Sequence, residues 1–528
     1  MQVIQTERRP GSMFIIQTLR RAVQIRAQGT ATIYGDRHQT WAQFQERVSR
    51  LAGAFAQLGV ERGDRVAILA LNSDRYLEYF YGIAWAGAAS NPVNIRLAPP
   101  EIAYTLEDSR SRVLFVDDAF SQMLPALKPL LKTVAHIVFI GEGACPEGCI
   151  EYEKLLAQAA PVPDVNAGGS DLAGLFYTGG TTGKSKGVML SHDNIVYNAL
   201  NVLPALGYDD TAIYLHAAPM FHLADMANTF ALTMAGGTHV MVPRFDVDAV
   251  LDAMVKHRVT HSILVPTMVN LLVNSERING CDLSSFRRLM YGASPMPEAV
   301  LRKAMNLLPG VRFAQGYGQT EASPVITFLE PRFHVKGGSK LTSAGRPAYG
   351  VEVMIFDSED RELPRGQVGE ICARGMNVMM GYWGLDEQTE QTLRGGWLHT
   401  GDLGYMDDEG FVFIVDRAKD MIISGGENVF SVEVEGAIYE HPGVQECAVI
   451  GVPSEQWGEA VHAVVVPKPG VTLTEELILT HCRERIAGYK LPRSVTVRGE
   501  PLPVSGAGKI LKTELRKPFW GGRNRQVN

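Results

Sequence analysis

The chain has 528 residues, of which 46% are hydrophobic and 20% are charged, and it carries a formal net charge of −7. This length exceeds one ordinary hydrophobic core, so we expect about two to four domains in a globular protein of normal composition. The acidic balance and the absence of a basic tract argue against a general nucleic-acid-binding protein.

Residues 1–11 are polar, which predicts no secretory signal peptide, and the chain lacks the run of about eighteen apolar residues that would predict a membrane span. Of the six cysteines only Cys145 and Cys149 lie close together, and no second pair of metal ligands follows them. Reduced thiols are therefore favoured over a zinc half-site. These features together predict a cytoplasmic protein.

Short apolar runs alternate with helical patterns over the first two thirds of the chain. A helix is expected over residues 76–88, and buried strands are expected at residues 66–70, 113–116, 137–140, 239–242 and 262–265. Alternation of this kind predicts an α/β fold in which mostly parallel sheets are covered by helices.

Residues 177–187 read Tyr-Thr-Gly-Gly-Thr-Thr-Gly-Lys-Ser-Lys-Gly and follow an apolar run. Glycines expose backbone N–H groups, threonines add hydroxyl donors and lysines add positive charge, which together suit a polyphosphate. The spacing excludes a Walker A loop, because Thr178 stands where that motif needs glycine. Ser191, just beyond, is expected to cap a helix.

Two further clusters carry polar groups beside apolar segments. Residues 315–321 combine glycines with Tyr317, a flat face for a base, and with Thr320 and Glu321, oxygen ligands for a cation such as Mg²⁺. An ordinary turn with a solvated glutamate is the alternative. His222 follows an apolar turn, and a lone histidine is more often structural than catalytic.

The pattern changes near residue 350. Short strands at residues 351–356, 369–373 and 411–415 predict a small β-rich unit. Within it, Asp402 stands in a tight turn where a carboxylate can accept hydrogen bonds from ribose hydroxyls or cap a backbone turn. After a boundary close to Lys419, a new pattern predicts a helix capped by Ser431, strands at residues 444–452 and 460–466, and a helix at 474–487.

These clusters, with the Asp-Arg-Ala-Lys-Asp run at 416–420 and a terminal Gly-Lys at 508–509, occur in an order that resembles the acyl-activating superfamily of adenylate-forming enzymes. That superfamily includes acyl-CoA synthetases, peptide-synthetase adenylation domains and beetle luciferases. The resemblance runs from residue 40 to Lys509. It implies a large amino-terminal AMP-binding domain (1–418, with a β-rich subdomain at about 345–418) and a small mobile α+β domain (419–528).

The phosphate loop departs from the family pattern Thr-Ser-Gly-Thr-Thr-Gly-x-Pro-Lys-Gly at two positions. Gly179 replaces the serine and removes a hydroxyl contact, for which backbone N–H groups could compensate. Ser185 replaces the proline and loosens the loop before Lys186.

The resemblance also implies roles for individual residues. The β- and γ-phosphates of ATP would be held by Thr178, Gly180, Thr181, Thr182, Gly183 and Lys186. Adenine would stack on Tyr317, in a site completed by Gly292, Ala293, Ser294, Gln315, Gly316 and Gly318. Asp402 and Arg417 would bind the ribose. Thr320 would contact the α-phosphate, and Glu321 with Thr181 would hold Mg²⁺.

Lys509 would bridge the attacking carboxylate and the phosphate, and His222 would border that carboxylate. Lys419 matches the hinge about which the small domain rotates between two half-reactions. The tunnel for the pantetheine arm of CoA would then be lined by Ser424, Gly425, Gly426 and Glu427.

The implied reaction is ATP-dependent acyl-CoA synthesis through an acyl-adenylate. The sequence shows no lysine or arginine suited to a second carboxylate, which favours a monocarboxylic acid: first a medium- to long-chain fatty acid, then an aryl or phenylpropenoic acid. No carrier module follows Asn528, which favours CoA as the thiol over a carrier protein. The sequence leaves the oligomeric state open, with a homodimer as one option.

Four other functions compete with this interpretation. They are a carrier-loading adenylation domain, a luciferase-like oxygenase, a Walker-type ATPase and a non-catalytic acyl- or nucleotide-binding sensor. The presence of both Glu321 and Lys509 argues against the sensor.

Overall fold

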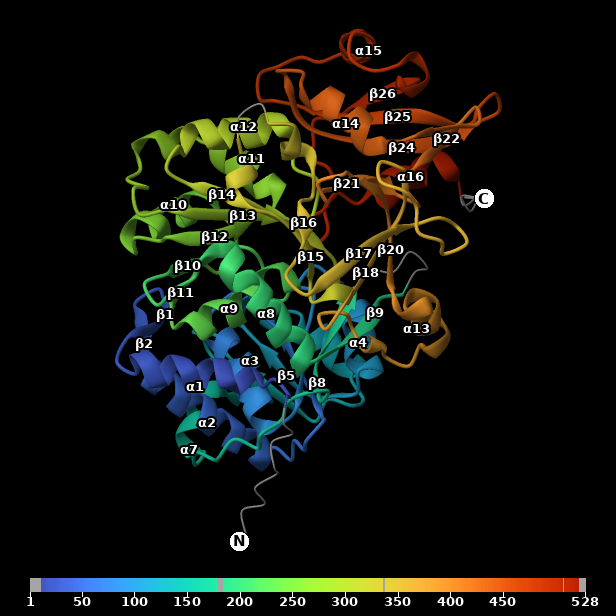
Figure 1. Ribbon diagram of the computed structural model, residues 1–528. Helices are drawn as coiled ribbons and strands as arrows, with labels where there is room; N and C mark the ends of the chain where they lie inside the picture. Colours follow the sequence, from blue (N-terminus) through green and yellow to red (C-terminus); the bar gives the residue numbers. More distant parts are fainter. Residues whose placement is uncertain (1–10, 179–183, 336–337, 507, 522–528) are drawn as a thin grey trace.

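Two mixed sheets flanked by helices make up the larger part of the molecule (Figure 1). The computed structural model describes residues 11–178, 184–335, 338–506 and 508–521. In spatial order the first sheet contains β16 (Arg346–Pro347), β15 (Val325–Leu329), β14 (Arg312–Gly318), β13 (Arg288–Gly292), β12 (His261–Leu264), β10 (Ile213–His216), β11 (Thr238–Met241), β1 (Thr30–Tyr34) and β2 (Arg37–Thr40).

The second sheet has the order β19 (Gly381–Tyr382), β9 (Lys186–Ser191), β8 (Leu172–Thr178), β4 (Ala89–Pro92), β3 (Arg65–Leu69), β5 (Ser111–Val116), β6 (His136–Phe139) and β7 (Ile150–Glu151). Strands β8, β4, β3, β5, β6 and β7 pair in parallel, whereas β9 pairs antiparallel with both β8 and β19. Both sheets are thus mostly parallel with antiparallel edges, which confirms the α/β prediction.

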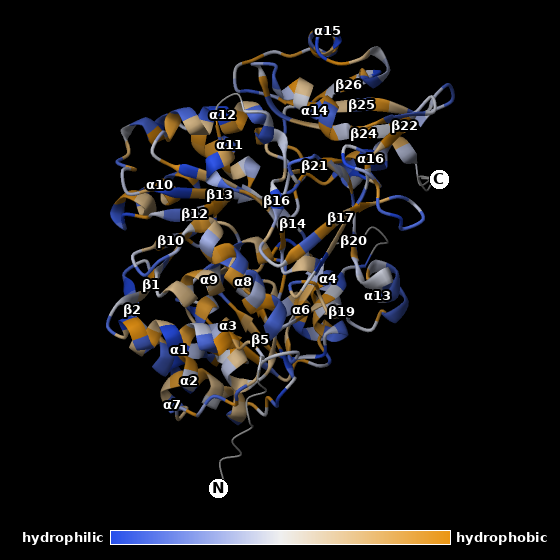
Figure 2. Ribbon diagram, in the orientation of Figure 1, coloured by the Kyte–Doolittle hydropathy of each residue, from blue (hydrophilic) through white to orange (hydrophobic). Residues whose placement is uncertain are grey.

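Helices cover these two sheets. Those of the first half are α1 (Ile15–Arg26), α2 (Trp41–Gln57), α3 (Asp74–Ala86), α4 (Pro99–Asp108), α5 (Asp118–Ser121), α6 (Leu124–Leu127), α7 (Tyr152–Gln158), α8 (His192–Leu206) and α9 (Leu223–Ala235). They are followed by α10 (Val247–Lys256), α11 (Pro266–Asn274), α12 (Glu298–Leu307) and α13 (Asp386–Thr392). Figure 2 shows hydrophobic residues concentrated along the strands that lie between the helices.

Helix α3 joins the two layers through aromatic contacts. The ring of Tyr79 meets Phe115 of β5 edge-on at 5.7 Å between centroids, and the ring of Phe80 meets Phe230 of α9 at 6.1 Å. All four side chains are buried. Edge-to-face pairs of this kind add to the burial of apolar area, so the two sheets share one continuous core.

An antiparallel sheet and a small carboxyl-terminal unit complete the fold. The antiparallel sheet contains β17 (Val351–Phe356), β18 (Gly369–Gly375), β20 (Leu398–Met406) and β21 (Val412–Arg417). The last sheet contains β23 (Glu427–Val429), β22 (Ile422–Ser424), β25 (Gly458–Pro467), β24 (Val444–Ser454) and β26 (Ser494–Val497), packed with α14 (Ser431–Tyr439), α15 (Glu475–Arg483) and α16 (Lys512–Trp520). The division of the domains at residues 418 and 419 stays a prediction.

The two expected serine caps have different outcomes. Ser191 precedes α8 and forms a capping box with Asn194, in which each side chain accepts from the other's backbone N–H, as the sequence predicts. Ser431 does not cap α14. Instead its N–H and its hydroxyl both donate to the carboxylate of Asp416, at 2.5 and 3.0 Å, and Phe430 holds the cap position.

Candidate active site

Neighbouring parallel strands bring their carboxyl ends to one edge of the first sheet, where ligands of α/β folds commonly bind. Gly292, at the end of β13, pairs with Gly316 of β14. A Cβ atom on Gly292 would lie 2.2 Å from the carbonyl oxygen of Gly316. Only glycine fits there, so two backbones form a flat surface at the position expected for adenine.

Tyr317, Asp402 and Arg417 form one network above this surface. The Tyr317 hydroxyl donates to Asp402 Oδ2 at 2.8 Å, and Arg417 Nε lies 3.1 Å from Asp402 Oδ1. Asp402 and Arg417 face each other across β20 and β21. Burial, and then the nearby charge of Asp402, raise the pKa of Tyr317, so its hydroxyl stays a donor. The structure therefore brings together the three residues expected to bind adenine and ribose.

Glu321 lies in the short helical turn η3 (Thr320–Ala322), directly after β14. Its Oε1 accepts a hydrogen bond from the Tyr382 hydroxyl at 2.9 Å, and its backbone carbonyl accepts one from Met379 N at 2.8 Å. The Lys186 ammonium lies 4.9 Å from the centroid of the same Tyr382 ring. Tyr382 thus connects the expected cation ligand with the expected phosphate lysine.

A cavity of about 280 Å³ opens beside Glu321. Its walls are formed by Gln319, Glu321, Glu370, Tyr382, Gln391, Thr392, Arg394, His399, Thr400 and Gly401. Carboxylate, amide and hydroxyl oxygens are the ligands that hard cations prefer, so the chemistry of this wall fits Mg²⁺.

Glu370, Cys372 and His399 form a second group that could hold a metal ion, with ligand atoms within 4.8 Å of one another. His399 Nδ1 already lies 2.8 Å from Glu370 Oε2 and 3.3 Å from Cys372 Sγ. Burial raises the pKa of the Cys372 thiol, which keeps it protonated and makes it a poor ligand. These groups satisfy one another without an ion.

Lys509 reaches the same site from the carboxyl-terminal unit. Burial, then repulsion from Arg417, lower the pKa of Lys509 to about 8, although Asp402 and Glu321 attract its charge. Burial and the charge of Lys509 also lower the pKa of His222 to about 3, so the imidazole is neutral. His222 Nδ1 accepts from Ala224 N at 3.2 Å at the start of α9.

Contacts on both sides hold the loop that carries Lys509. Arg96 Nη1 donates to the carbonyl of Val504 at 3.2 Å, a hydrogen bond that joins the larger part of the molecule to the carboxyl-terminal unit. Gly506 lies so close to Asn94 and Phe221 that a Cβ atom would meet them at 2.3 and 2.8 Å. The lysine therefore enters the site on a loop packed against the larger part of the molecule.

Part of the expected phosphate site lies outside the described residues, namely Gly180, Thr181, Thr182 and Gly183. The ends of the loop are described. Thr178 is the last residue of β8, Lys186 is the first residue of β9, and the two are paired across this hairpin. Both strands belong to the second sheet.

The expected hinge and pantetheine residues lie in the carboxyl-terminal region. Burial, and then the charge of Arg417, lower the pKa of Lys419. Strands β22 and β23 pair so that Ser424 faces Glu427, with Gly425 and Gly426 in the left-handed turn between them. Gly425 packs on Trp457, so this hairpin contacts its own sheet.

Sequence reasoning missed Tyr382, whose only signal is its place in a Gly-Tyr-Trp run just before α13. Asp225 lies three residues after His222, and its position in the sequence would suit either a helix cap or a side chain facing the bound acid. In the structure Asp225 is fully buried, accepts from the Tyr214 hydroxyl at 2.9 Å and lies 2.6 Å from His216 Nδ1. It therefore belongs to the core beneath α9.

Comparisons with known proteins agree with this geometry. Residues 19–383 match the family model "AMP-binding enzyme", and residues 433–509 match "AMP-binding enzyme C-terminal domain". Feruloyl-CoA synthase of Amycolatopsis sp is 39% identical over 94% of this chain and 98% of its own. The long-chain-fatty-acid–CoA ligase FadD13 of Mycobacterium tuberculosis is 35% identical over 92% of this chain and 94% of its own. The solved anthranilate CoA ligase AuaEII, in complex with anthranoyl-AMP, superposes with a TM-score of 0.89 at 29% identity, covering 97% and 98% of the two chains.

Fold and site together define an adenylate-forming enzyme. The chain belongs to the AMP-binding enzyme family, as one of its AMP-forming acid–CoA ligases. Among the described residues, no helix combines the length and the hydrophobicity needed to cross a bilayer.

Proposed function

We propose that this enzyme converts a monocarboxylic acid with an apolar body, ATP and CoA into acyl-CoA, AMP and pyrophosphate. One observation carries the proposal: Asp402 is held by both Tyr317 and Arg417 at the carboxyl end of β14. The charges of Arg417, Asp402 and Glu321 act on Lys509, whose own charge acts on His222. A cation held there, at the carboxyl edge of the sheet, can join a carboxylate to a phosphate. Because ATP and CoA are available in the cytoplasm, we place the reaction there.

In the first half-reaction the acid's carboxylate oxygen attacks the α-phosphate, and the bond from that phosphorus to pyrophosphate breaks. Negative charge gathers at phosphorus, so fixed donors and cations lower the barrier. Lys509 would contact both reacting groups, Thr320 would donate to the α-phosphate, and neutral His222 would border the acid without adding charge. Glu321 and Thr181 would hold Mg²⁺, which would neutralise charge on the phosphates.

Nucleotide binding is divided among three elements. Tyr317 would stack on adenine against the Gly292–Gly316 backbone, while Asp402 and Arg417 would bind the ribose hydroxyls. Thr178 and Lys186, with the loop between them, would hold the β- and γ-phosphates. The Tyr317–Asp402–Arg417 network fixes these side chains before the ligand enters, which reduces the entropy lost on binding.

In the second half-reaction the CoA thiolate attacks the acyl carbon and AMP leaves. Lys509 has no role in that step and occupies space beside the acyl group, so we propose that the small domain turns about Lys419 to remove it. The hairpin of Ser424, Gly425, Gly426 and Glu427 would then line the path of the pantetheine arm.

The identity of the acid is the finer part of the proposal. We place aromatic acids of the phenylpropenoic or benzoic type first and medium- to long-chain fatty acids second, the reverse of the order from sequence alone. One observation supports this order: the feruloyl-CoA relative is 39% identical to this chain, whereas the fatty-acid relative is 35% identical.

A panel of acids tests the proposal. Each acid is incubated with ATP, Mg²⁺ and CoA, and AMP, pyrophosphate and acyl-CoA are measured. We expect stoichiometric AMP and acyl-CoA with substituted cinnamic or benzoic acids. Faster turnover of fatty acids would reverse the order of the two acid classes, and the absence of pyrophosphate with every acid would overturn the proposal.

A further inference from the structure

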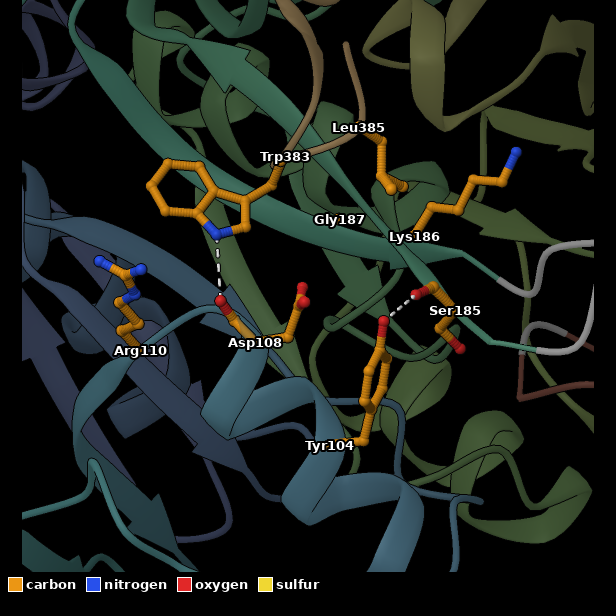
Figure 3. A pocket seen from close by; sticks show the side chains of 9 residues that line it. Tyr104, Asp108, Arg110, Ser185, Lys186, Gly187, Trp383 and Leu385 are labelled. Carbon is orange, nitrogen blue, oxygen red and sulfur yellow. Dashed lines mark hydrogen bonds between the residues drawn. The ribbon is translucent and has the colours of Figure 1, made fainter. Parts of the chain in front are cut away.

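Helix α4 contacts both ends of the phosphate loop: strand β8 on one side, and on the other Ser185, which directly precedes β9. Its last residue, Asp108, accepts a hydrogen bond from the Tyr177 hydroxyl at 2.6 Å through Oδ2. One turn earlier, the Tyr104 hydroxyl donates to the carbonyl of Ser185 at 3.3 Å (Figure 3). Residues four apart lie on one face of a helix, so a single rigid element contacts both sides of the hairpin.

These contacts stand directly beside the groups proposed to bind phosphate. Tyr177 precedes Thr178, and Ser185 precedes Lys186. The pairing of Thr178 with Lys186 transmits the position of each strand to the other. A shift of either strand would therefore move both phosphate-binding residues.

Further contacts strengthen this arrangement. The Lys184 ammonium lies 5.2 Å from the centroid of the Tyr104 ring, a cation–π distance. The indole Nε1 of Trp383 donates to the backbone carbonyl of Asp108 at 3.0 Å (Figure 3). Trp383 N also donates to Gly187 O at 2.8 Å. Burial and the bond to Asp108 raise the pKa of Tyr177, which keeps its hydroxyl a donor.

We propose that Tyr104 and Asp108 are positioning residues that clamp the two stems of the phosphate loop and so preset Thr178 and Lys186 for the polyphosphate of ATP. The inference rests on the proposed function, because it assumes that these two residues bind the β- and γ-phosphates. It also explains how the loop manages without a proline before Lys186: Tyr104 holds the carbonyl of the serine that stands there.

The clamp should change only the binding of the β- and γ-phosphates of ATP. AMP lacks the β- and γ-phosphates, and so does the acyl-adenylate that reacts with CoA. One hydrogen bond contributes about fivefold to an equilibrium. We therefore expect Tyr104→Phe to weaken ATP binding about fivefold and Asp108→Ala about fivefold to tenfold, with AMP binding unchanged.

The experiment measures the dissociation constants of ATP and AMP by calorimetry, together with the KM for ATP and the rate of thiolysis of a supplied acyl-adenylate. Asp108→Asn retains an acceptor for Tyr177 and should restore most of the ATP affinity lost in Asp108→Ala. Tyr197→Phe is the matched control, because its hydroxyl also donates to a backbone carbonyl, that of Gly350 at 3.2 Å, which directly precedes β17 and does not belong to the phosphate loop.

Loss of ATP affinity in Tyr104→Phe and Asp108→Ala alone, with thiolysis intact, supports the clamp. Equal losses for ATP and AMP, or a parallel loss of thiolysis, would show a general structural role and overturn it. Unchanged ATP affinity in both variants would also overturn it. If the unaltered enzyme binds ATP no more tightly than AMP and releases no pyrophosphate, the proposed function itself fails, which is a separate outcome.

Discussion

Replacing Lys509 gives the sharpest test of the two-step mechanism. Lys509→Ala removes the cation proposed to join carboxylate and α-phosphate, so we expect adenylate formation to fall by about 10²–10³-fold, as when one preorganised transition-state donor is lost. Thiolysis of a supplied acyl-adenylate should change by less than about threefold, because that step places no new charge where Lys509 stood.

The electrostatic magnitude follows from the titration of Lys509. Burial lowers its pKa from 10.5 to about 8. At about 1.4 kcal/mol per pKa unit, this lowering amounts to about 3 kcal/mol against the charged form of the lysine. Since the pKa is lowered relative to the hydrated lysine, the penalty is fully present below pH 8 and disappears as the pH rises toward 10.5. The phosphates of ATP supply the countercharge that removes it.

Two assays separate the half-reactions: ATP–pyrophosphate exchange for the first and release of AMP from supplied acyl-adenylate with CoA for the second. In the free enzyme kcat/KM for exchange should decline above pH 8, as Lys509 loses its proton. Lys509→Arg is the matched control, because guanidinium stays charged and the decline should move beyond the accessible range. Equal loss of both half-reactions in Lys509→Ala, or an unchanged decline in Lys509→Arg, would refute the reasoning.

Three other perturbations have defined outcomes. Tyr317→Phe should raise the KM for ATP about fivefold, the effect of one hydrogen bond to Asp402, and an unchanged KM would contradict the network. Lys419→Pro should leave pyrophosphate release intact and slow acyl-CoA formation at least about tenfold if the hinge moves there, whereas unaltered overall turnover would argue for another pivot. Lys512→Met should lower the free energy of unfolding, measured by calorimetry, by about 3 kcal/mol, because it leaves Glu435 buried without its 2.7 Å ion pair. Adding Glu435→Leu should restore most of the lost stability. If the double variant stays as unstable as Lys512→Met, the loss comes from packing and not from the unpaired charge.

Two sheet strands could be predicted from different apolar patterns. The continuous apolar run at residues 113–116 is fully buried inside β5 (Ser111–Val116), whereas the run at 351–356 coincides with β17 (Val351–Phe356), in which Glu352 is exposed between buried residues. Helix ends were less predictable. The helix expected at 474–487 is shorter in the structure, where α15 ends at Arg483. The apolar periodicity of the sequence continues beyond Arg483, so it did not indicate where the chain turns toward β26.

The site was predictable where neighbouring residues share a loop and unpredictable where distant segments meet. Tyr317 and Glu321 lie within one glycine-containing segment, so the sequence alone indicates that their side chains belong to the same site. The bond from Tyr382 to Glu321 joins residues 61 apart, and that from Tyr104 to Ser185 joins residues 81 apart. No local pattern reports such distances, since they depend on how β19 and α4 pack against β9.

The two hydrogen bonds from Ser431 to Asp416 have a consequence for the rate of turnover. Asp416 precedes Arg417 on β21, yet its carboxylate holds the first residue of α14, beside the ammonium of Lys512 on α16. The rotation about Lys419 proposed above would separate these partners and re-form their hydrogen bonds in each catalytic cycle. Under that proposal, the rate at which the Asp416–Ser431 contact breaks sets an upper limit on the rate of turnover.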